Sequence, residues 1–178
     1  MKILAFAASN SFTSINKQLV EHATSLIQKR NAEIEIEVLD LNDFEMPLYR
    51  PDREEQSGIP QEARAFYKKI GEADAVLIAF AEHNGSYTAA YKNIFDWTSR
   101  ISMSVYQDKP MVLMATSPGK GGAANVLRTA TDSAKYFGMD VRASVSVAEF
   151  YNHYDAEKNE ITDDEINSQI ENALTTIL

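Results

Sequence analysis

Residues 9–16 carry hydroxyl and amide side chains at a spacing suited to holding an anion. They follow an apolar run, Ile3 to Ala8, and precede a segment whose apolar residues recur at helical spacing. The N-terminus of a helix carries roughly half a positive charge and exposes free N–H groups, which together favour a phosphate. No lysine or arginine appears before Lys17, so neutral donors would hold the anion. The alternative is a capped turn without a ligand, because helix starts commonly use Ser, Thr and Asn. The donors are Ser9, Ser11, Thr13, Ser14 and Asn16.

A second polar segment, residues 81–88, follows the apolar run Ala75 to Phe80. Glu82 and His83 could suggest acid–base chemistry, but neither a nucleophile nor a second carboxylate accompanies them. We therefore interpret His83 as a polar loop residue rather than a catalytic group. The dipeptide Asn84-Gly85 is typical of a turn.

A third segment, residues 116–123, follows the apolar run Met111 to Ala115 and has three glycines in four positions. Glycines let backbone amides approach a ligand closely, although they can also simply relieve crowding. The segment does not match the phosphate-binding loop of nucleotide hydrolases, because no Lys-Ser or Lys-Thr pair follows the glycines.

Strand-like and helix-like patterns alternate about five times around these segments. This alternation predicts an α/β fold in which a parallel sheet has helices on both faces. Ligands of such sheets bind beyond the carboxyl ends of the strands, where all three segments would lie. The predicted strands are residues 3–8, 33–41, 75–80, 111–115 and 141–147, and the helices lie near residues 17–29, 63–70, 94–101, 127–137 and 166–177.

Three further features of the chain lead to separate expectations. Residues 42–60 form the longest irregular stretch, and loops of this length usually serve function or an interface. Thr162 and Glu165 have the spacing of a capping box before the last helix. Phe95, Trp97, Ile101 and Met103 could lie in an interface or in the core, and the sequence leaves both open.

Length and composition limit the class of protein. The chain has 178 residues and is most simply one domain, residues 1–178. A formal net charge of -9 argues against binding to nucleic acid or to an anionic membrane surface. The absence of cysteine excludes disulfides, thiolate metal sites and cysteine nucleophiles. No signal peptide or membrane span is evident, so we expect a cytoplasmic protein.

The three segments together resemble the NAD(P)H-dependent FMN reductase family, a flavodoxin-like group that includes quinone and azo-dye reductases. The family's Gly-Ser-x-Arg-x-x-Ser-x-Asn pattern is similar to residues 8–16. Its Pro-Glu-Tyr-Asn-Gly-Ser segment, followed by Leu-Lys-Asn-x-x-Asp-Trp, resembles residues 81–86 and 91–97. Its Ser-x-Gly-x-x-Gly-Gly loop resembles residues 117–122 with one residue fewer between the glycines, and residues 40–49 resemble the segment after the second strand.

This resemblance implies a flavodoxin-like three-layer sandwich with a five-stranded parallel sheet of order 2-1-3-4-5. It implies that FMN is the cofactor, that NADPH or NADH donates hydride, and that a quinone, flavin or azo compound accepts it. It also implies a homodimer or homotetramer, and no catalytic side chain, because the flavin carries the chemistry. The residues implied for the FMN phosphate are Ser9, Ser11, Ser14, Ile15 and Asn16. Those implied for the flavin ring are Glu82, His83, Asn84, Gly85, Ser86, Ser117, Pro118, Gly119, Lys120, Gly121 and Gly122.

Departures from the family pattern bear on affinity. Ala8 replaces the glycine, and Ser11 replaces the arginine that helps bind the phosphate, which suggests weaker FMN binding. Ala81 and His83 replace the proline and tyrosine beside the ring.

Two other functions fit the same sequence features. A flavodoxin-like electron carrier would use its acidic surface to dock on a basic protein partner without oxidising NAD(P)H. The phosphate loop, however, lacks the Thr/Ser-Gly-Asn-Thr pattern of true flavodoxins. A flavin- or nucleotide-sensing module would bind flavin without turnover.

Overall fold

A five-stranded sheet lies at the centre of the computed structural model, which describes all residues, 1–178. The strand order is β2-β1-β3-β6-β7, and each neighbouring pair is parallel. Numbered among themselves along the chain, these strands have the order 2-1-3-4-5, so the predicted sheet is confirmed. Its strands are β1 (Lys2–Ala8), β2 (Glu35–Leu39), β3 (Ala75–Phe80), β6 (Lys109–Thr116) and β7 (Met139–Val147).

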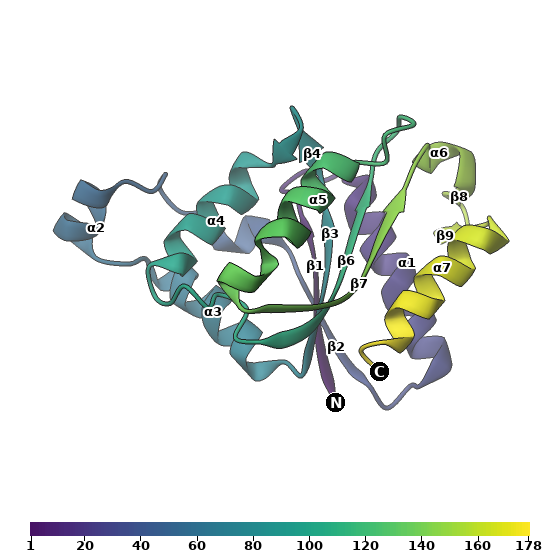
Figure 1. The fold of residues 1–178 in the computed structure, drawn as a ribbon, viewed down its shortest axis with the longest axis horizontal. Helices are drawn as coiled ribbons and strands as arrows, with labels where there is room; N and C mark the ends of the chain where they lie inside the picture. Colours follow the sequence, from purple (N-terminus) through teal and green to yellow (C-terminus); the bar gives the residue numbers. More distant parts are fainter.

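Helices cover both faces of this sheet (Figure 1). One face is covered by α1 (Ile15–Arg30) and α7 (Asp164–Thr175), and the other by α3 (Gln61–Glu72), α4 (Ala89–Ser99) and α5 (Ala124–Ser133). Successive side chains of a strand point to opposite faces, so β1 contributes to two hydrophobic clusters. Ile3 and Ala5 lie in the cluster under α1 and α7, whereas Leu4 and Phe6 lie in the cluster under α3, α4 and α5.

The burial of each strand explains its sequence pattern. All six residues of β3 are buried, because helices cover both of its faces in the middle of the sheet. The edge strands β2 and β7 are partly exposed, in agreement with their alternating polar and apolar residues. The predicted bounds of β3 are exact, whereas β6 and β7 each begin two residues before the predicted strand.

Two local expectations are corrected. The last helix is capped by Asp163, whose carboxylate accepts hydrogen bonds from the N–H groups of Glu165 and Ile166. Thr162 does not form the predicted capping box, because Asp163 accepts the N–H of Glu165 and the N–H of Thr162 donates to the carbonyl of His153. Residues 42–60 are not wholly irregular: they include most of a 3-10 turn, η1 (Leu41–Phe44), and the short helix α2 (Pro51–Ser57).

The α2 segment projects from the body of the molecule, and none of its residues is buried (Figure 1). The chain leading to it is nevertheless fixed to α4, because the indole N–H of Trp97 donates to the carbonyl of Pro47 at 2.7 Å. Trp97 and Phe95 are buried and belong to the core. Of the other two residues left open between core and interface, Ile101 packs against this core and is partly buried, whereas Met103 is exposed.

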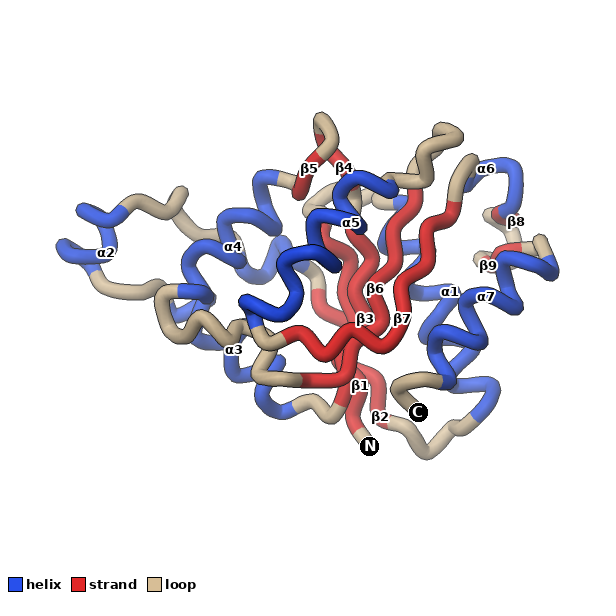
Figure 2. The backbone as a smooth tube through the Cα atoms, viewed as in Figure 1, coloured by secondary structure: helices blue, strands red, loops and turns tan.

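Short elements complete the chain (Figure 2). Two hairpins that the sequence patterns did not predict pair β4 (Glu82–His83) with β5 (Ser86–Tyr87), and β8 (Tyr154–Asp155) with β9 (Glu160–Ile161). The 3-10 turn η2 (Ala134–Phe137) continues α5, and α6 (Phe150–His153) precedes β8. None of the helices is both long enough and apolar enough to cross a membrane.

Candidate functional site: three loops at the carboxyl ends of the strands

The three polar loops lie at the same edge of the sheet. Residues 9–14 follow β1, the β4–β5 hairpin follows β3, and residues 117–123 follow β6. These three strands are neighbours in the order β1-β3-β6, so their carboxyl ends bring the loops together (Figure 2). This is the edge at which doubly wound sheets bind their ligands.

The first loop leaves several hydrogen-bond donors available. The hydroxyl oxygens of Ser9, Ser11 and Ser14 each accept a backbone N–H, from Ser11 at 3.2 Å, Thr13 at 3.3 Å and Lys17 at 3.3 Å respectively. An oxygen that accepts in this way keeps its own hydrogen for another acceptor. Ser14 is the N-cap of α1, while Ser9 and Ser14 are buried and Ser11 is exposed.

The first residues of α1 have different roles. The backbone N–H groups of Ile15 and Asn16 have no acceptor within the chain, as expected at the start of a helix. The side chain of Ile15 packs against the core. The side chain of Asn16 is 2% exposed and pairs with the backbone of Thr116, donating to its carbonyl at 3.2 Å and accepting from its N–H at 3.0 Å. Asn16 therefore offers a ligand its backbone N–H, and its side chain joins α1 to β6.

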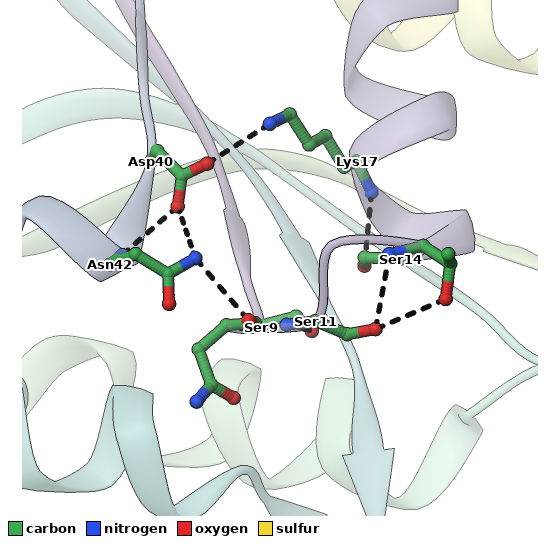
Figure 3. Close-up of polar contacts among 8 residues, drawn as sticks. Ser9, Ser11, Ser14, Lys17, Asp40 and Asn42 are labelled. Carbon is green, nitrogen blue, oxygen red and sulfur yellow. Dashed lines mark hydrogen bonds and ion pairs between the residues drawn. The ribbon is translucent and has the colours of Figure 1, made fainter.

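The cation nearest in sequence to the first loop is already paired. The ammonium of Lys17 donates to Oδ2 of Asp40 at 3.0 Å, and its side chain extends toward Asp40 and away from Ser11 (Figure 3). The other oxygen of Asp40 accepts from the backbone N–H and the side-chain amide of Asn42. The same side-chain amide donates to the carbonyl of Asn10 at 3.3 Å, which links the end of β2 to the loop.

The second loop is a tight hairpin. Asn84 and Gly85 have φ values of 52° and 76°, as a two-residue turn of this kind requires. Their neighbours His83 and Ser86 pair across the hairpin and are exposed, as are Asn84 and Gly85. The four residues therefore form a projecting tip whose polar groups face solvent.

Glu82, which the resemblance implies for the flavin ring, also caps a helix. One carboxylate oxygen accepts from the backbone N–H of Val126 at 2.9 Å, and the other from the side-chain amide of Asn125 at 3.4 Å. These donors lie in the first turn of α5, where a negative charge is stabilising. Glu82 thus ties the second loop to the helix that follows the third loop.

The third loop exposes backbone donors. Pro118, Gly119, Lys120 and Gly121 are exposed, and the N–H groups of the last three have no acceptor within the chain. The carbonyls of Ser117 and Gly119 accept from the N–H groups of Phe150 and Glu149, which fixes the loop against the start of α6.

Gly122 differs from the other glycines of the third loop. It is buried with φ +55°, and a Cβ there would lie 2.4 Å from Oγ of Ser146. A Cβ on Gly119 or Gly121 would meet nothing within 4 Å. Gly122 therefore serves the packing of the loop on β7, whereas Gly119 and Gly121 face open space.

The sequence patterns did not single out Thr88 as a functional residue. Its hydroxyl donates to the carbonyl of Ala8 at 3.0 Å and accepts from the N–H of Tyr91 at 3.2 Å, so it caps α4 and holds the end of β1. The cap could have been identified from one sequence signal: threonine is a common N-cap residue, and Thr88 precedes a helical pattern. Nothing in the sequence indicated the contact with Ala8, 80 residues away.

A cavity of 220 Å³ lies beside the first loop. It is bounded by residues of the first loop, of the segment after β2 and of α4. Asn10, Asn42 and Asn93 line it together with Phe44, Met46 and Leu48, and the side-chain amides of Asn42 and Asn93 already donate within the chain. A site at this edge can therefore combine neutral hydrogen-bond donors with apolar surface, as small-molecule sites commonly do.

Comparison with known proteins identifies the family. The family described as NADPH-dependent FMN reductase matches residues 1–152. The chain is 34% identical to an NADPH:quinone oxidoreductase of Arabidopsis thaliana, over 68% of this chain and 61% of that protein. It is 35% identical to a 2-hydroxy-1,4-benzoquinone reductase of a Burkholderia species, over 70% of this chain and 64% of that protein. The matches thus span less than two thirds of these relatives' length.

Solved structures support the same fold. FerB, a flavoenzyme NAD(P)H:(acceptor) oxidoreductase of Paracoccus denitrificans, superposes with a TM-score of 0.79 at 23% identity, covering 99% of this chain and 94% of that one. An FMN-dependent NADH-azoreductase of Bacillus anthracis in complex with FMN gives 0.69 at 13% identity, covering 100% of both chains. The predicted flavodoxin-like architecture and the family resemblance are both confirmed, and the chain belongs to the NADPH-dependent FMN reductase family.

Proposed function

We propose that this protein is an FMN-dependent oxidoreductase that passes hydride from NAD(P)H to a small acceptor such as a quinone, a flavin or an azo compound. The observation that carries the proposal is the set of unpartnered donors at the carboxyl ends of β1 and β6. The N–H groups of Ile15 and Asn16 in the first loop, and of Gly119, Lys120 and Gly121 in the third, have no acceptor within the chain. The match to the NADPH-dependent FMN reductase family supports FMN as the ligand of these donors.

The first loop is suited to the phosphate of FMN. The hydroxyl groups of Ser9, Ser11 and Ser14 can each donate one hydrogen bond, and the free N–H groups of Ile15 and Asn16 add the start of the α1 dipole. All of these donors are uncharged. The phosphate would thus be held by geometry and number of donors rather than by an ion pair.

The second and third loops are suited to the flavin ring. His83, Asn84, Gly85 and Ser86 form the exposed hairpin tip, and residues 119–121 offer free N–H groups with open space over Gly119 and Gly121. Free N–H groups can hydrogen-bond the carbonyl oxygens and ring nitrogens of a flavin. We assign Glu82, the side chain of Asn16 and Gly122 a supporting role, because their contacts hold the loops in place.

The chain would position the reactants rather than supply an acid or base. Bound FMN supplies the hydride-accepting chemistry. Glu82 accepts hydrogen bonds from the start of α5, and His83 lies on the exposed hairpin, so neither is arranged as a buried proton donor. Holding two flat molecules in a reactive arrangement can by itself supply a large part of a rate enhancement.

A homodimer or homotetramer is part of the proposal. The α2 segment has no buried residue, and Leu48 just before it is 71% exposed. We expect a partner subunit to pack against Leu48 and the projecting α2 segment. Light scattering should give a mass of two or four chains, and the mass of a single chain would contradict this part.

The rival function is an electron carrier, which the net charge of -9 favours. The discriminating experiment is to follow NADPH and NADH consumption with FMN and 1,4-benzoquinone present. Repeated turnover that requires both the protein and FMN is expected. A protein that binds FMN but does not accelerate NAD(P)H oxidation would instead be a carrier or a sensing module.

A further inference from the structure

The first loop contains no positive charge of its own. Residues 9–16 include no lysine or arginine, and the cation that follows is Lys17. Lys17 lies in the first turn of α1, and its backbone N–H donates to Oγ of Ser14, so it lies beside the proposed phosphate donors. Its side chain, however, points toward Asp40 (Figure 3).

Asp40 is held firmly in the position that pairs with Lys17. Oδ2 lies 3.0 Å from Nζ of Lys17, and Oδ1 accepts from the backbone N–H of Asn42 at 3.0 Å and from its side-chain amide at 2.7 Å. The backbone N–H of Asn42 and, secondarily, the nearby Lys17 ammonium hold the pKa of Asp40 below its usual value. Asp40 is therefore ionised at neutral pH.

The Asp40–Lys17 pair acts on the loop at short range. The amide of Asn42 that binds Asp40 also donates to the carbonyl of Asn10, so the carboxylate is two hydrogen bonds from the loop backbone. This separation is shorter than the screening length of about 8 Å at physiological salt, so the charge of Asp40 is only partly screened at the backbone of Asn10. Paired as they are, Lys17 and Asp40 contribute almost no net charge there.

We propose that Asp40 withholds the charge of Lys17 from the phosphate loop and thereby keeps FMN an exchangeable ligand rather than a permanently bound group. This inference rests on the proposed function, since it assumes that residues 9–16 receive the phosphate. Hydrogen bonds from neutral donors are weaker than those from a charged donor, so we expect the phosphate to be released faster than from a loop with an unpaired cation. Exchange would let FMN leave in reduced form and act as a substrate as well as a cofactor.

Charge-changing variants test this inference. Asp40→Asn removes the carboxylate charge and keeps an oxygen that can accept from Asn42. It should tighten FMN binding at least about fivefold, because the freed Lys17 charge then acts on the phosphate. Lys17→Met should weaken FMN binding by a similar factor, because Asp40 is left uncompensated. The double variant Asp40→Asn, Lys17→Met should return to within about twofold of the original affinity.

Three controls make the measurement specific. Riboflavin, which lacks the phosphate, should bind all variants equally. Glu37→Gln removes the same charge from β2, shortly before Asp40, but Glu37 pairs with Lys2 and Lys69, so FMN affinity should stay unchanged. Ser11→Arg restores the arginine of the family pattern and should tighten FMN, which shows that the assay detects an added cation.

The outcomes separate this inference from the proposed function. If Ser11→Arg tightens FMN while Asp40→Asn leaves it unchanged or weaker, Asp40 is only structural and the inference is wrong. If neither the original protein nor Ser11→Arg binds FMN at millimolar ligand, the proposed function itself fails. If Asp40→Asn does not fold, the affinities of the original protein for FMN and riboflavin test the inference instead. An FMN affinity more than about a hundredfold higher than that for riboflavin would overturn it.

Discussion

Asn16 at the start of α1 and Thr116 at the end of β6, 100 residues apart, are joined by two hydrogen bonds between one side chain and one backbone unit. The amide of Asn16 satisfies both the N–H and the carbonyl of Thr116, and both residues are 2% exposed. This pairing sets the first loop relative to the third. The start of α1, which carries the proposed phosphate donors, is thus joined directly to the strand that leads into the third loop.

Replacing Asn16 should lower the stability of the folded protein, because its side chain is buried and paired with Thr116. Asn16→Ala leaves the buried N–H and carbonyl of Thr116 unpaired, which should cost about 2 kcal/mol. In a domain of this size the melting temperature should fall by about 5 °C. The exposed Ser11→Ala serves as control and should melt as the original protein does. Unchanged melting of Asn16→Ala would show that the pairing does not form.

Glu82 should act on α5 rather than as an acid. Glu82→Ala removes the acceptor for the N–H of Val126 and should cost about 1 kcal/mol in urea denaturation. Glu82→Gln keeps an acceptor oxygen and should recover part of that loss. The matched control is Glu55→Ala, because Glu55 is exposed on α2 and makes no ion pair. If Glu82→Gln and Glu82→Ala lose the same free energy of unfolding, Glu82 does not cap α5.

The protein should lose stability in mildly acidic solution through His22. Burial lowers the pKa of His22 from its usual 6.5, and its Nδ1 accepts the N–H of Ile161 at 3.2 Å, while Nε2 faces Oδ1 of Asn167 at 2.7 Å. The unfolded chain therefore binds a proton at higher pH than the folded one. Stability should be constant above about pH 7 and fall below the unfolded-state pKa.

Denaturation curves at several pH values check this prediction, with His22→Gln as the comparison. The variant should show a smaller decrease between about pH 7 and about pH 5, because it has no group to protonate at this position. His83→Gln, at an exposed position, should keep the profile of the original protein. If His22→Gln and the original protein lose stability in parallel, His22 is not the group responsible.

Two adjacent glycines should respond differently to alanine. Gly122→Ala places a Cβ 2.4 Å from Oγ of Ser146 and 3.1 Å from the backbone nitrogen of Ala148 at a positive φ, so it should cost about 2 kcal/mol. Gly121→Ala meets no atom within 4 Å and should fold normally. It should weaken flavin binding instead, because the methyl group would enter the open space over the loop. Similar stability of the two variants would contradict this division.

The sheet was predictable because its signals are local. Continuous apolar runs such as Ala75 to Phe80 identify strands covered on both faces, and the exact bounds of β3 follow from that. The polar loops were also recognisable, since hydroxyl and glycine residues cluster directly after those runs.

The contacts that hold the loops together were not predictable. Asn16 and Thr116 lie 100 residues apart, Thr88 and Ala8 lie 80 apart, and Glu82 and Val126 lie 44 apart. No local pattern distinguishes an asparagine that binds a phosphate from one that binds a distant backbone. The predicted cap of α7 was one residue too early, because Asp163 rather than Thr162 accepts the N–H groups of Glu165 and Ile166.

The most direct test is a visible spectrum of the protein with stoichiometric FMN, recorded without oxygen before and after NADPH is added. The account predicts that FMN co-elutes or titrates with the protein and that its yellow bands bleach at a catalytic rate. It also predicts that added quinone restores them. A flavin spectrum that NADPH and NADH both leave unchanged, in a protein that retains its fold, would contradict the proposed oxidoreductase.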